Sequence, residues 1–405
     1  MIKKITITTS ARLHFNSLKM NAIGGRGCGG VGLALESPIL EMNFYPNKNI
    51  SVVGGTSHFQ KKSSLFAKAI LNYIKKPGVT IKINKSFLNQ IGLGSETQLG
   101  LSIGKGISLL YNHNLSLKKI ASITKRAGIS GIGYYAFFRG GLIIDGGYKM
   151  GLSEEKRTFA DHASSPPPLT GNYKFPKNWK ILLIIPRQST IDVSKFDENK
   201  FFEENCPVPL KEVEAICTDV LMGLIPAVKE SDYFNFIEYL SHLLNLGTKK
   251  IELELNKKRI NETNKKLDGL LANKFIRIQK CKYILIPNNI VFTKKDLLRY
   301  TDLRQRYSTD IILNKLSLNN SEINRYLMDL QSLLTIKYPP NKIPFLGLSS
   351  LGATMYSILL SDYHKIDYIL KETRKILRKD WLVMLVSARN KPAKINISYG
   401  SSKQK

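Results

Sequence analysis

The chain has 405 residues, of which 43% are hydrophobic and 9% aromatic, so it is long and apolar enough for about two or three domains with buried cores, which excludes a wholly disordered protein. The longest aliphatic run, Ile181 to Ile185, is much shorter than the about 20 apolar residues that cross a bilayer. The N-terminus alternates like a strand and lacks the apolar centre of a signal peptide, so we expect a cytoplasmic protein without a membrane partner. The formal net charge of +30 favours anionic ligands, from small phosphates to nucleic acid, although a solvated basic surface would give the same charge.

The cysteines and histidines argue against two kinds of site. The four cysteines form no C-x-x-C pair, and the six histidines include no H-x-x-x-H spacing. We therefore expect neither a disulfide framework nor a zinc site.

The first elements indicate a mixed α+β unit. Ile5 to Phe15 alternates as a half-buried strand does. The glycine-rich segment from Gly24 to Leu35 predicts a loop close to a ligand or another backbone, followed by a strand. A helix over Ser63 to Lys75 and a strand over Val79 to Ile83 come next.

The stretch GLGSETQLGL, from Gly92 to Leu101, joins a glycine turn to the start of an amphipathic helix. Amides at a helix start point at whatever occupies the turn and favour negative charge, so this junction predicts a phosphate site. Ser95 and Gln98 match the S-x-x-Q capping box. An ordinary capped helix after a turn would show the same pattern.

The middle of the chain predicts a boundary between two domains. A helix from Ser116 to Gly128 precedes an expected hairpin, formed by the apolar segment Tyr134 to Phe138 and the strand Leu142 to Asp145. The proline-rich region Ser164 to Pro176 is the expected linker, and the strand Trp179 to Ile185 opens the second domain.

The second half alternates helical patterns with one segment of different composition. Helices are expected over Val213 to Leu224 and Tyr233 to Leu246. The segment from about Lys249 to Lys342 is dense in Lys, Asn and Glu but keeps a helical stripe at Ile323, Leu327, Leu330 and Leu334. The last elements predicted are a glycine-serine turn that opens a helix, a further helix and a strand, over Gly347 to Tyr356, His364 to Leu377 and Trp381 to Val386.

Several of these segments, in this order, resemble the beta-ribofuranosylaminobenzene 5'-phosphate synthases, relatives of the GHMP small-molecule kinases. They are ARLHF, GGVGLALESP, GLGSETQLGL, SGIGYYAF with GGLIIDGG, FPKNWKILLIIP, GLSSLGATMY and ARN. The resemblance implies an α+β, GHMP-kinase-like two-domain fold. Its parts are a ribosomal-S5-like domain over 1–165 and a ferredoxin-like domain over 175–405, interrupted by a basic insertion at about 249–342, with the ligand between the two.

The resemblance also implies a reaction. These enzymes condense 4-aminobenzoate with phosphoribosyl pyrophosphate, releasing pyrophosphate and carbon dioxide, in methanopterin biosynthesis. Positive charge develops on the sugar and negative charge on the leaving group, so cationic donors, backbone amides and Mg²⁺ are expected, and no protein nucleophile is needed. The alternatives are 4-hydroxybenzoate as the acid, an ATP-dependent GHMP-type kinase, and a basic RNA-binding protein. A homodimer is also expected.

Four side chains are the candidates for catalysis or tight binding. Arg12 and Arg26, beside glycine-rich segments, would hold a phosphate or the carboxylate of the acid, or would be surface arginines. His14 faces away from its strand neighbours and would donate a hydrogen bond in the site or be structural. Asp145 would hold magnesium or offset the sugar cation, or be a turn residue. The turns supply the other candidates for substrate binding: Gly92, Gly94, Ser95, Thr97, Gln98, Ser130, Gly131, Ser349 and Ser350.

Three features depart from the family pattern. Glu96 stands where a small residue is usual, and its carboxylate would repel phosphate unless it turns away or holds a metal ion. Asn172 stands where an arginine is expected, which leaves room for a changed substrate. The segment at about 249–342 is longer than the family needs, and we expect it to be dispensable for catalysis.

Overall fold

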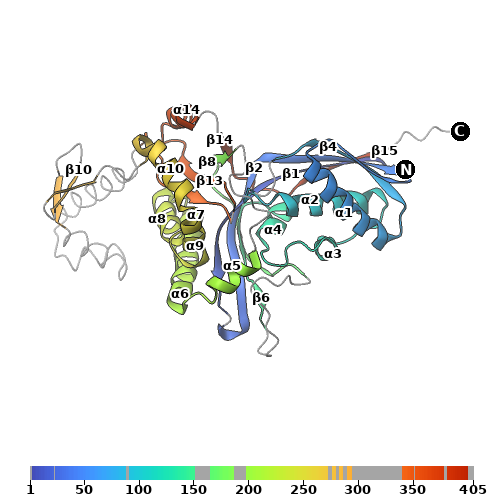
Figure 1. The fold of residues 1–405 in the computed structure, drawn as a ribbon, viewed down its shortest axis with the longest axis horizontal. Helices are drawn as coiled ribbons and strands as arrows, with labels where there is room; N and C mark the ends of the chain where they lie inside the picture. Colours follow the sequence, from blue (N-terminus) through green and yellow to red (C-terminus); the bar gives the residue numbers. More distant parts are fainter. Residues whose placement is uncertain are drawn as a thin grey trace.

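The computed structural model describes residues 2–21, 23–87, 91–150, 165–186, 198–271, 276–279, 282–285, 290–293, 340–350, 352–377 and 381–399. Figure 1 shows two helix-covered sheets joined through the long strands of the first. The expected helical stripe at 323–334 and Cys281 lie outside the described residues.

The first sheet has eight strands and is antiparallel except for one pair. Its main path runs β15-β1-β2-β4-β3, in which only β3 and β4 are parallel. Off this path, β5 and β6 pair with β2, and β7 pairs with β5. Its strands are β1 (Ile2–Lys19), β2 (Arg26–Asn47), β3 (Ile50–Val53), β4 (Gly78–Lys85), β5 (Leu142–Asp145), β6 (Tyr148–Lys149), β7 (Leu169–Tyr173) and β15 (Lys394–Tyr399). The last strand of the chain thus returns to the first domain.

Four helices cover one side of this sheet (Figure 1). They are α1 (Ser57–Ile74), α2 (Ser95–Leu110), α3 (Leu117–Ile123) and α4 (Ile132–Phe138), and they share one apolar core with the strands. α1 begins six residues earlier than the expected Ser63, because Thr56 caps it by accepting the Phe59 N–H.

The second sheet is antiparallel, in the order β12-β13-β8-β14. Alternate residues of β8 face opposite sides: Trp179 and Ile181 join the core beneath α7 and α8, whereas Leu182 and Ile184 join the core beneath α14. The strands are β12 (Gly347–Leu348), β13 (Met355–Leu360), β8 (Trp179–Pro186) and β14 (Trp381–Ser387).

The remaining elements are one short helix between β1 and β2 and, after β8, the other helices and a small sheet. The helices are η1 (Ile23–Gly25), α5 (Glu198–Asn205), α6 (Leu210–Thr218), η3 (Asp219–Leu224), α7 (Ile225–Glu230), α8 (Tyr233–Leu243), α9 (Gly247–Leu255), α10 (Lys257–Leu267), η4 (Asp268–Leu270) and α14 (Ile366–Leu377). A third sheet consists of β9 (Ile276–Gln279), β10 (Lys282–Leu285) and β11 (Ile290–Thr293). Within the described part of the chain, no helix is both long and apolar enough to cross a membrane.

Four local predictions are wrong. The glycine-rich segment is not a loop, because β2 runs through it from Arg26 and pairs with β1, β5 and β6. The apolar segment expected as the first hairpin strand is helix α4, and the helix expected after the Gly347 turn is strand β13. Part of the expected linker forms β7, which pairs with β5. Short apolar runs buried on all sides have no periodicity that separates helix from strand, which explains the second and third errors.

Candidate active site

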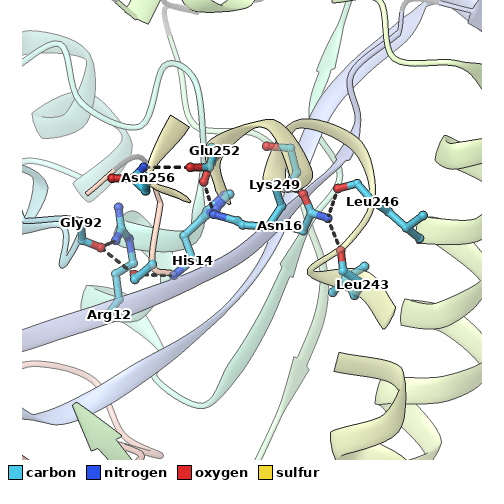
Figure 2. A network of polar contacts seen from close by, with 11 residues as sticks. Arg12, His14, Asn16, Gly92, Leu243, Leu246, Lys249, Glu252 and Asn256 are labelled. Atoms are coloured by element: carbon cyan, nitrogen blue, oxygen red, sulfur yellow. Dashed lines mark hydrogen bonds and ion pairs between the residues drawn. The ribbon is translucent and has the colours of Figure 1, made fainter. Parts of the chain in front are cut away.

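The candidate site lies along β1, which carries Arg12 beside Gly92, His14 beside Lys249 of α9, and Asn16 at the end of α8 (Figure 2). The pairing of β1 with β2 is irregular between Ser10 and Arg12 and again between His14 and Asn16. Such bulges bend a strand and re-aim its side chains. Asn16 is fully buried, and its Nδ2 donates to the Leu243 carbonyl oxygen, 2.7 Å away, which ties β1 to the end of α8.

Arg12 contacts the predicted phosphate turn directly. Its backbone N–H donates to the Leu93 carbonyl oxygen, 3.1 Å away, and its Nη1 donates to the Gly92 carbonyl oxygen. Gly94 has a φ of 77°, and a Cβ there would lie 3.1 Å from both Cγ and Nε of Arg12. Glycine at 94 is therefore favoured both by the backbone conformation and by the arginine beside it.

The second predicted turn closes on the first. The Ser349 Oγ donates to the Gly92 carbonyl oxygen at 2.7 Å and accepts the His14 backbone N–H at 3.2 Å. The Ser350 N–H donates to the His14 carbonyl oxygen at 3.3 Å. A Cβ on Gly352 would lie 2.0 Å from the Gly92 nitrogen, so the two turns are in backbone contact. Two segments about 250 residues apart thus form one wall of the site.

Asp145, at the end of β5, has no exposed surface. Its Oδ2 accepts the Gly131 N–H at 2.9 Å, and its Oδ1 accepts the Gly147 N–H at 3.1 Å. Burial raises the pKa of Asp145 from 3.8 to about 7, and the two amide hydrogen bonds lower it only in part. The Arg26 Nη1 donates to the carbonyl oxygens of Gly146 and Gly147, 2.8 and 2.9 Å away, so Arg26 and Asp145 hold the same turn.

His14 and Asp145 approach each other across Gly30. A Cβ on Gly30 would lie 3.0 Å from His14 Nε2 and 3.4 Å from Asp145 Oδ2. His14 is 8% exposed, and its Nδ1 has no hydrogen-bond partner among the described residues. Burial, then the positive charges of Lys249 and Arg12, lower the pKa of His14 well below 6.5, so the imidazole is neutral at pH 7.

A buried ion pair that the sequence analysis missed completes this region. Lys249, on α9, is fully buried, and its Nζ contacts Glu252 Oε2. Figure 2 shows this pair beside His14 and Arg12. Burial lowers the pKa of Lys249, whereas the charge of Glu252 raises it. A Lys- and Glu-rich sequence is typical of a solvated surface, so no local signal marked this pair as buried.

The structure moves the start of the expected insertion. Leu267 and Leu270, which follow α9, are buried in the core of the second sheet. Leu271 forms a bridge with Ile343, and the Ile343 N–H donates to the Leu270 carbonyl oxygen, 2.7 Å away. Residues 249–271 therefore belong to the second domain rather than to an insertion.

The two unusual polar residues have local partners. The Glu96 carboxylate lies 3.2 Å from Arg126 Nη1, 3.4 Å from His58 Nε2 and 3.5 Å from Lys62 Nζ, so nearby positive charge offsets its own. The Asn172 Nδ2 donates to the Gly140 carbonyl oxygen at 2.7 Å and holds β7 against the start of β5. A structural role accounts for Asn172.

The capping box predicted for Ser95 and Gln98 is wrong. α2 starts after Gly94, which supplies no side-chain cap. Gln98 points inward instead: its Nε2 donates to the Gly133 carbonyl oxygen at 2.7 Å, and its Oε1 accepts the Thr9 hydroxyl at 2.6 Å. Gln98 thereby links α2 to α4 and β1.

The other small candidates lie where the turns meet α4. A Cβ on Gly133 would lie 3.1 Å from Thr97 Cγ2, so Thr97 packs against the α4 backbone. The Ser130 Oγ accepts the Ile132 N–H at 3.3 Å, directly beside the Gly131 amide that holds Asp145. Substrate contacts of Ser95, Thr97, Gln98, Ser130 and Ser350 stay predictions, as do those of the remaining candidates Arg12, Gly92, Gly94, Gly131 and Ser349.

Direct binding of magnesium by Asp145 fits the geometry poorly. Both carboxyl oxygens already accept amide hydrogen bonds, and the group is fully buried with a raised pKa. Mg²⁺ prefers ionised carboxylates and keeps several water or phosphate oxygens around it. In the described ranges, no three His, Cys, Asp or Glu side chains gather as a metal site.

The fold and the helix-start turn define a class of protein. Residues 60–141 match the family model of the GHMP kinases N terminal domain. The fold resembles that of mevalonate diphosphate decarboxylase from Staphylococcus aureus, with 10% identity, a TM-score of 0.51 and 98% of each chain covered. It also resembles a Listeria monocytogenes protein described as a homoserine kinase, with 12% identity, a TM-score of 0.53 and coverage of 98% of this chain and 100% of that one. The predicted α+β GHMP-kinase-like fold is confirmed.

Sequence identity narrows the class to one family. The chain is 38% identical over 278 residues to beta-ribofuranosylphenol 5'-phosphate synthase of Methanocaldococcus jannaschii, covering 64% of this chain and 84% of that relative. It is 35% identical over 256 residues to the enzyme of that name from Archaeoglobus fulgidus, covering 62% and 78%. The chain belongs to this synthase family, which confirms the resemblance, although the names of these relatives specify a phenol rather than an aminobenzene.

Proposed function

We propose that the protein transfers ribose 5-phosphate from phosphoribosyl pyrophosphate to the carboxylate-bearing ring carbon of 4-hydroxybenzoate, releasing pyrophosphate and carbon dioxide, for methanopterin-type cofactor biosynthesis. The observation that carries this proposal is the contact of Arg12 with the Gly92–Gly94 turn beside buried His14 and Asp145, in a chain of this family. A ribofuranosylphenol product, as in the names of the relatives, requires the hydroxy acid. The corresponding compound with an amino group in place of the hydroxyl, 4-aminobenzoate, is the second substrate to test.

The chemistry assigns a charge to each part of the site. The bond from the sugar C1 to pyrophosphate breaks with its electron pair on the leaving group, while the ring carbon bonds to C1. The bond to the carboxylate then breaks, and its electron pair restores the aromatic ring as carbon dioxide leaves. The Arg12 guanidinium and the amides at the start of α2 would stabilise the pyrophosphate. Ionised Asp145 would offset the positive sugar.

In the proposed reaction, magnesium would enter the site bound to phosphoribosyl pyrophosphate. When bound to the pyrophosphate oxygens, it would neutralise the charge of the leaving group. The residues suited to hold the resulting complex are Arg12 and the backbone amides after Gly94, since Asp145 is better suited to hydrogen bonding.

Release of pyrophosphate that depends on an added aromatic acid tests the function. The protein is mixed with phosphoribosyl pyrophosphate, magnesium and either 4-hydroxybenzoate or 4-aminobenzoate, and pyrophosphate is measured. We expect release that requires an aromatic acid, and Arg12→Gln should lower it strongly, whereas Arg139→Gln, a change at an exposed arginine, should not. In a parallel mixture with ATP and small alcohols, formation of ADP without any acid-dependent pyrophosphate would establish the kinase alternative instead.

A further inference from the structure

His14 is a buried side chain of the site, and one of its ring nitrogens has no hydrogen-bond partner among the described residues. It lies between the Lys249–Glu252 pair on one side and Gly30 with Asp145 on the other. Its Nδ1 has no partner in the described part of the chain. Buried polar atoms are nearly always hydrogen-bonded, so a nitrogen without a partner in a site points to a ligand group.

The surroundings keep this imidazole unprotonated, which is the form that can accept a proton. Burial, and then the positive charges of Lys249 and Arg12, lower its pKa, so it takes up a proton only from a strongly acidic group. Glu252 compensates Lys249, so α9 holds a buried charge in place without leaving it unpaired. Gly30 has no side chain, and a Cβ there would lie 3.0 Å from His14 Nε2 and 3.4 Å from Asp145 Oδ2, so glycine lets both groups pack against the β2 backbone.

We infer that His14, which lies beside the Lys249–Glu252 pair, accepts the hydroxyl proton of 4-hydroxybenzoate and thereby makes the hydroxy acid a better substrate than 4-aminobenzoate. The inference deepens the proposed function and rests on it. It assigns α9 of the second domain to the site as the element that places a charge beside His14.

The step balances. As the ring carbon bonds to the sugar C1 and pyrophosphate leaves, the hydroxyl oxygen becomes strongly acidic and gives its proton to the neutral imidazole. When the carboxylate leaves as carbon dioxide, its electron pair returns to the ring, and the oxygen takes the proton back. An amino group donates its lone pair to the ring without having to lose a proton, so 4-aminobenzoate needs no such acceptor.

The ratio of turnover with the two acids tests the inference. Release of labelled carbon dioxide is measured with each acid for the unmodified protein, His14→Gln and His113→Gln, a control at an exposed histidine. We expect His14→Gln to lower turnover of 4-hydroxybenzoate about a hundredfold and of 4-aminobenzoate less than tenfold, since general-base catalysis contributes at least about a hundredfold. His113→Gln should change neither.

The other outcomes distinguish failure of the proton-acceptor role from failure of the proposed function. An equal loss with both acids, or no loss with either, would overturn the proton-acceptor role while leaving the proposed function standing. An unmodified protein that releases carbon dioxide from neither acid would refute the proposed function and the inference with it.

The ion pair is tested through the pH dependence of the same ratio. Lys249→Met removes a charge that lowers the pKa of His14, so on acidification the preference for 4-hydroxybenzoate should be lost at a higher pH than in the unmodified protein. Lys249→Arg should keep the profile of the unmodified protein, and so should Lys250→Met, which removes an exposed charge from the same helix. The double change Lys249→Met with Glu252→Gln removes both charges and guards against misfolding caused by one unpaired ion. An unchanged pH profile in the folded Lys249→Met protein would contradict the role of this charge.

Discussion

Asp145 couples the stability of the fold to pH. Its pKa is 3.8 by the reference value and about 7 in the folded protein, because burial disfavours the ionised form. The folded state therefore binds its proton more tightly than the unfolded state does. The contribution of Asp145 to stability is complete below about pH 4 and is lost as the pH rises through 7.

Asp145→Asn should remove this dependence. Between pH 5 and pH 8, the free energy of unfolding should fall by about 3 kcal/mol more in the unmodified protein than in the variant. Urea denaturation at the two pH values measures both. Parallel changes in the two proteins would show that Asp145 titrates normally in the fold.

Gly94→Val should abolish pyrophosphate binding while the protein stays folded. A branched side chain strains a φ of 77° and meets Arg12, the side chain that contacts the turn. Gly269→Val is the matched control, because nothing lies within 4 Å of a Cβ built there. Calorimetry with pyrophosphate measures both variants, and equal affinity in the Gly94 variant and the unmodified protein would refute the phosphate-turn interpretation.

At the scale of elements, the sequence predicted those with clear periodicity. The strands at Val79 and Trp179 and the helix at Tyr233 are observed, because one buried face leaves a regular pattern. The glycines of β2 misled the prediction, since what they provide is room for His14 and Ile132 across the strand rather than a loop.

The candidate site was predictable where local chemistry marks it. Arg12, Asp145 and the Gly92 turn lie beside glycines that indicate close backbone approach, and the structure brings them together with His14. The roles of Lys249 and Glu252 depend on the burial of α9, and that of Gly30 on its contacts with His14 and Asp145, which composition and spacing do not encode.

The boundary at Leu271 yields a prediction about the segment expected to be dispensable. Replacing residues 272–339 with a short Gly/Ser linker should leave turnover within about threefold of the unmodified protein. Leu271 and Ile343, which flank the segment, are already paired, so a short linker can join them. A deletion that starts at residue 249 should be inactive, since it removes the Lys249–Glu252 pair. A folded but inert 272–339 deletion would show that this segment contributes to the site.

At the scale of the whole molecule, the net charge of +30 predicts polyanion binding separate from catalysis. RNA should bind without sequence preference at 50 mM salt and lose roughly a thousandfold or more in affinity by about 200 mM. Filter binding across this range measures it. Sequence-selective binding that persists at the higher salt would favour the RNA-binding alternative, and sedimentation in the same buffers would test the expected homodimer.

We propose that one site of this two-domain GHMP-kinase-like fold couples loss of pyrophosphate to loss of a carboxylate. Carboxyl-labelled 4-hydroxybenzoate and phosphoribosyl pyrophosphate test this coupling when carbon dioxide and pyrophosphate are counted in the same reaction. We expect equal amounts of the two products, each dependent on both substrates. Pyrophosphate released without carbon dioxide, or neither product from a folded protein, would contradict it.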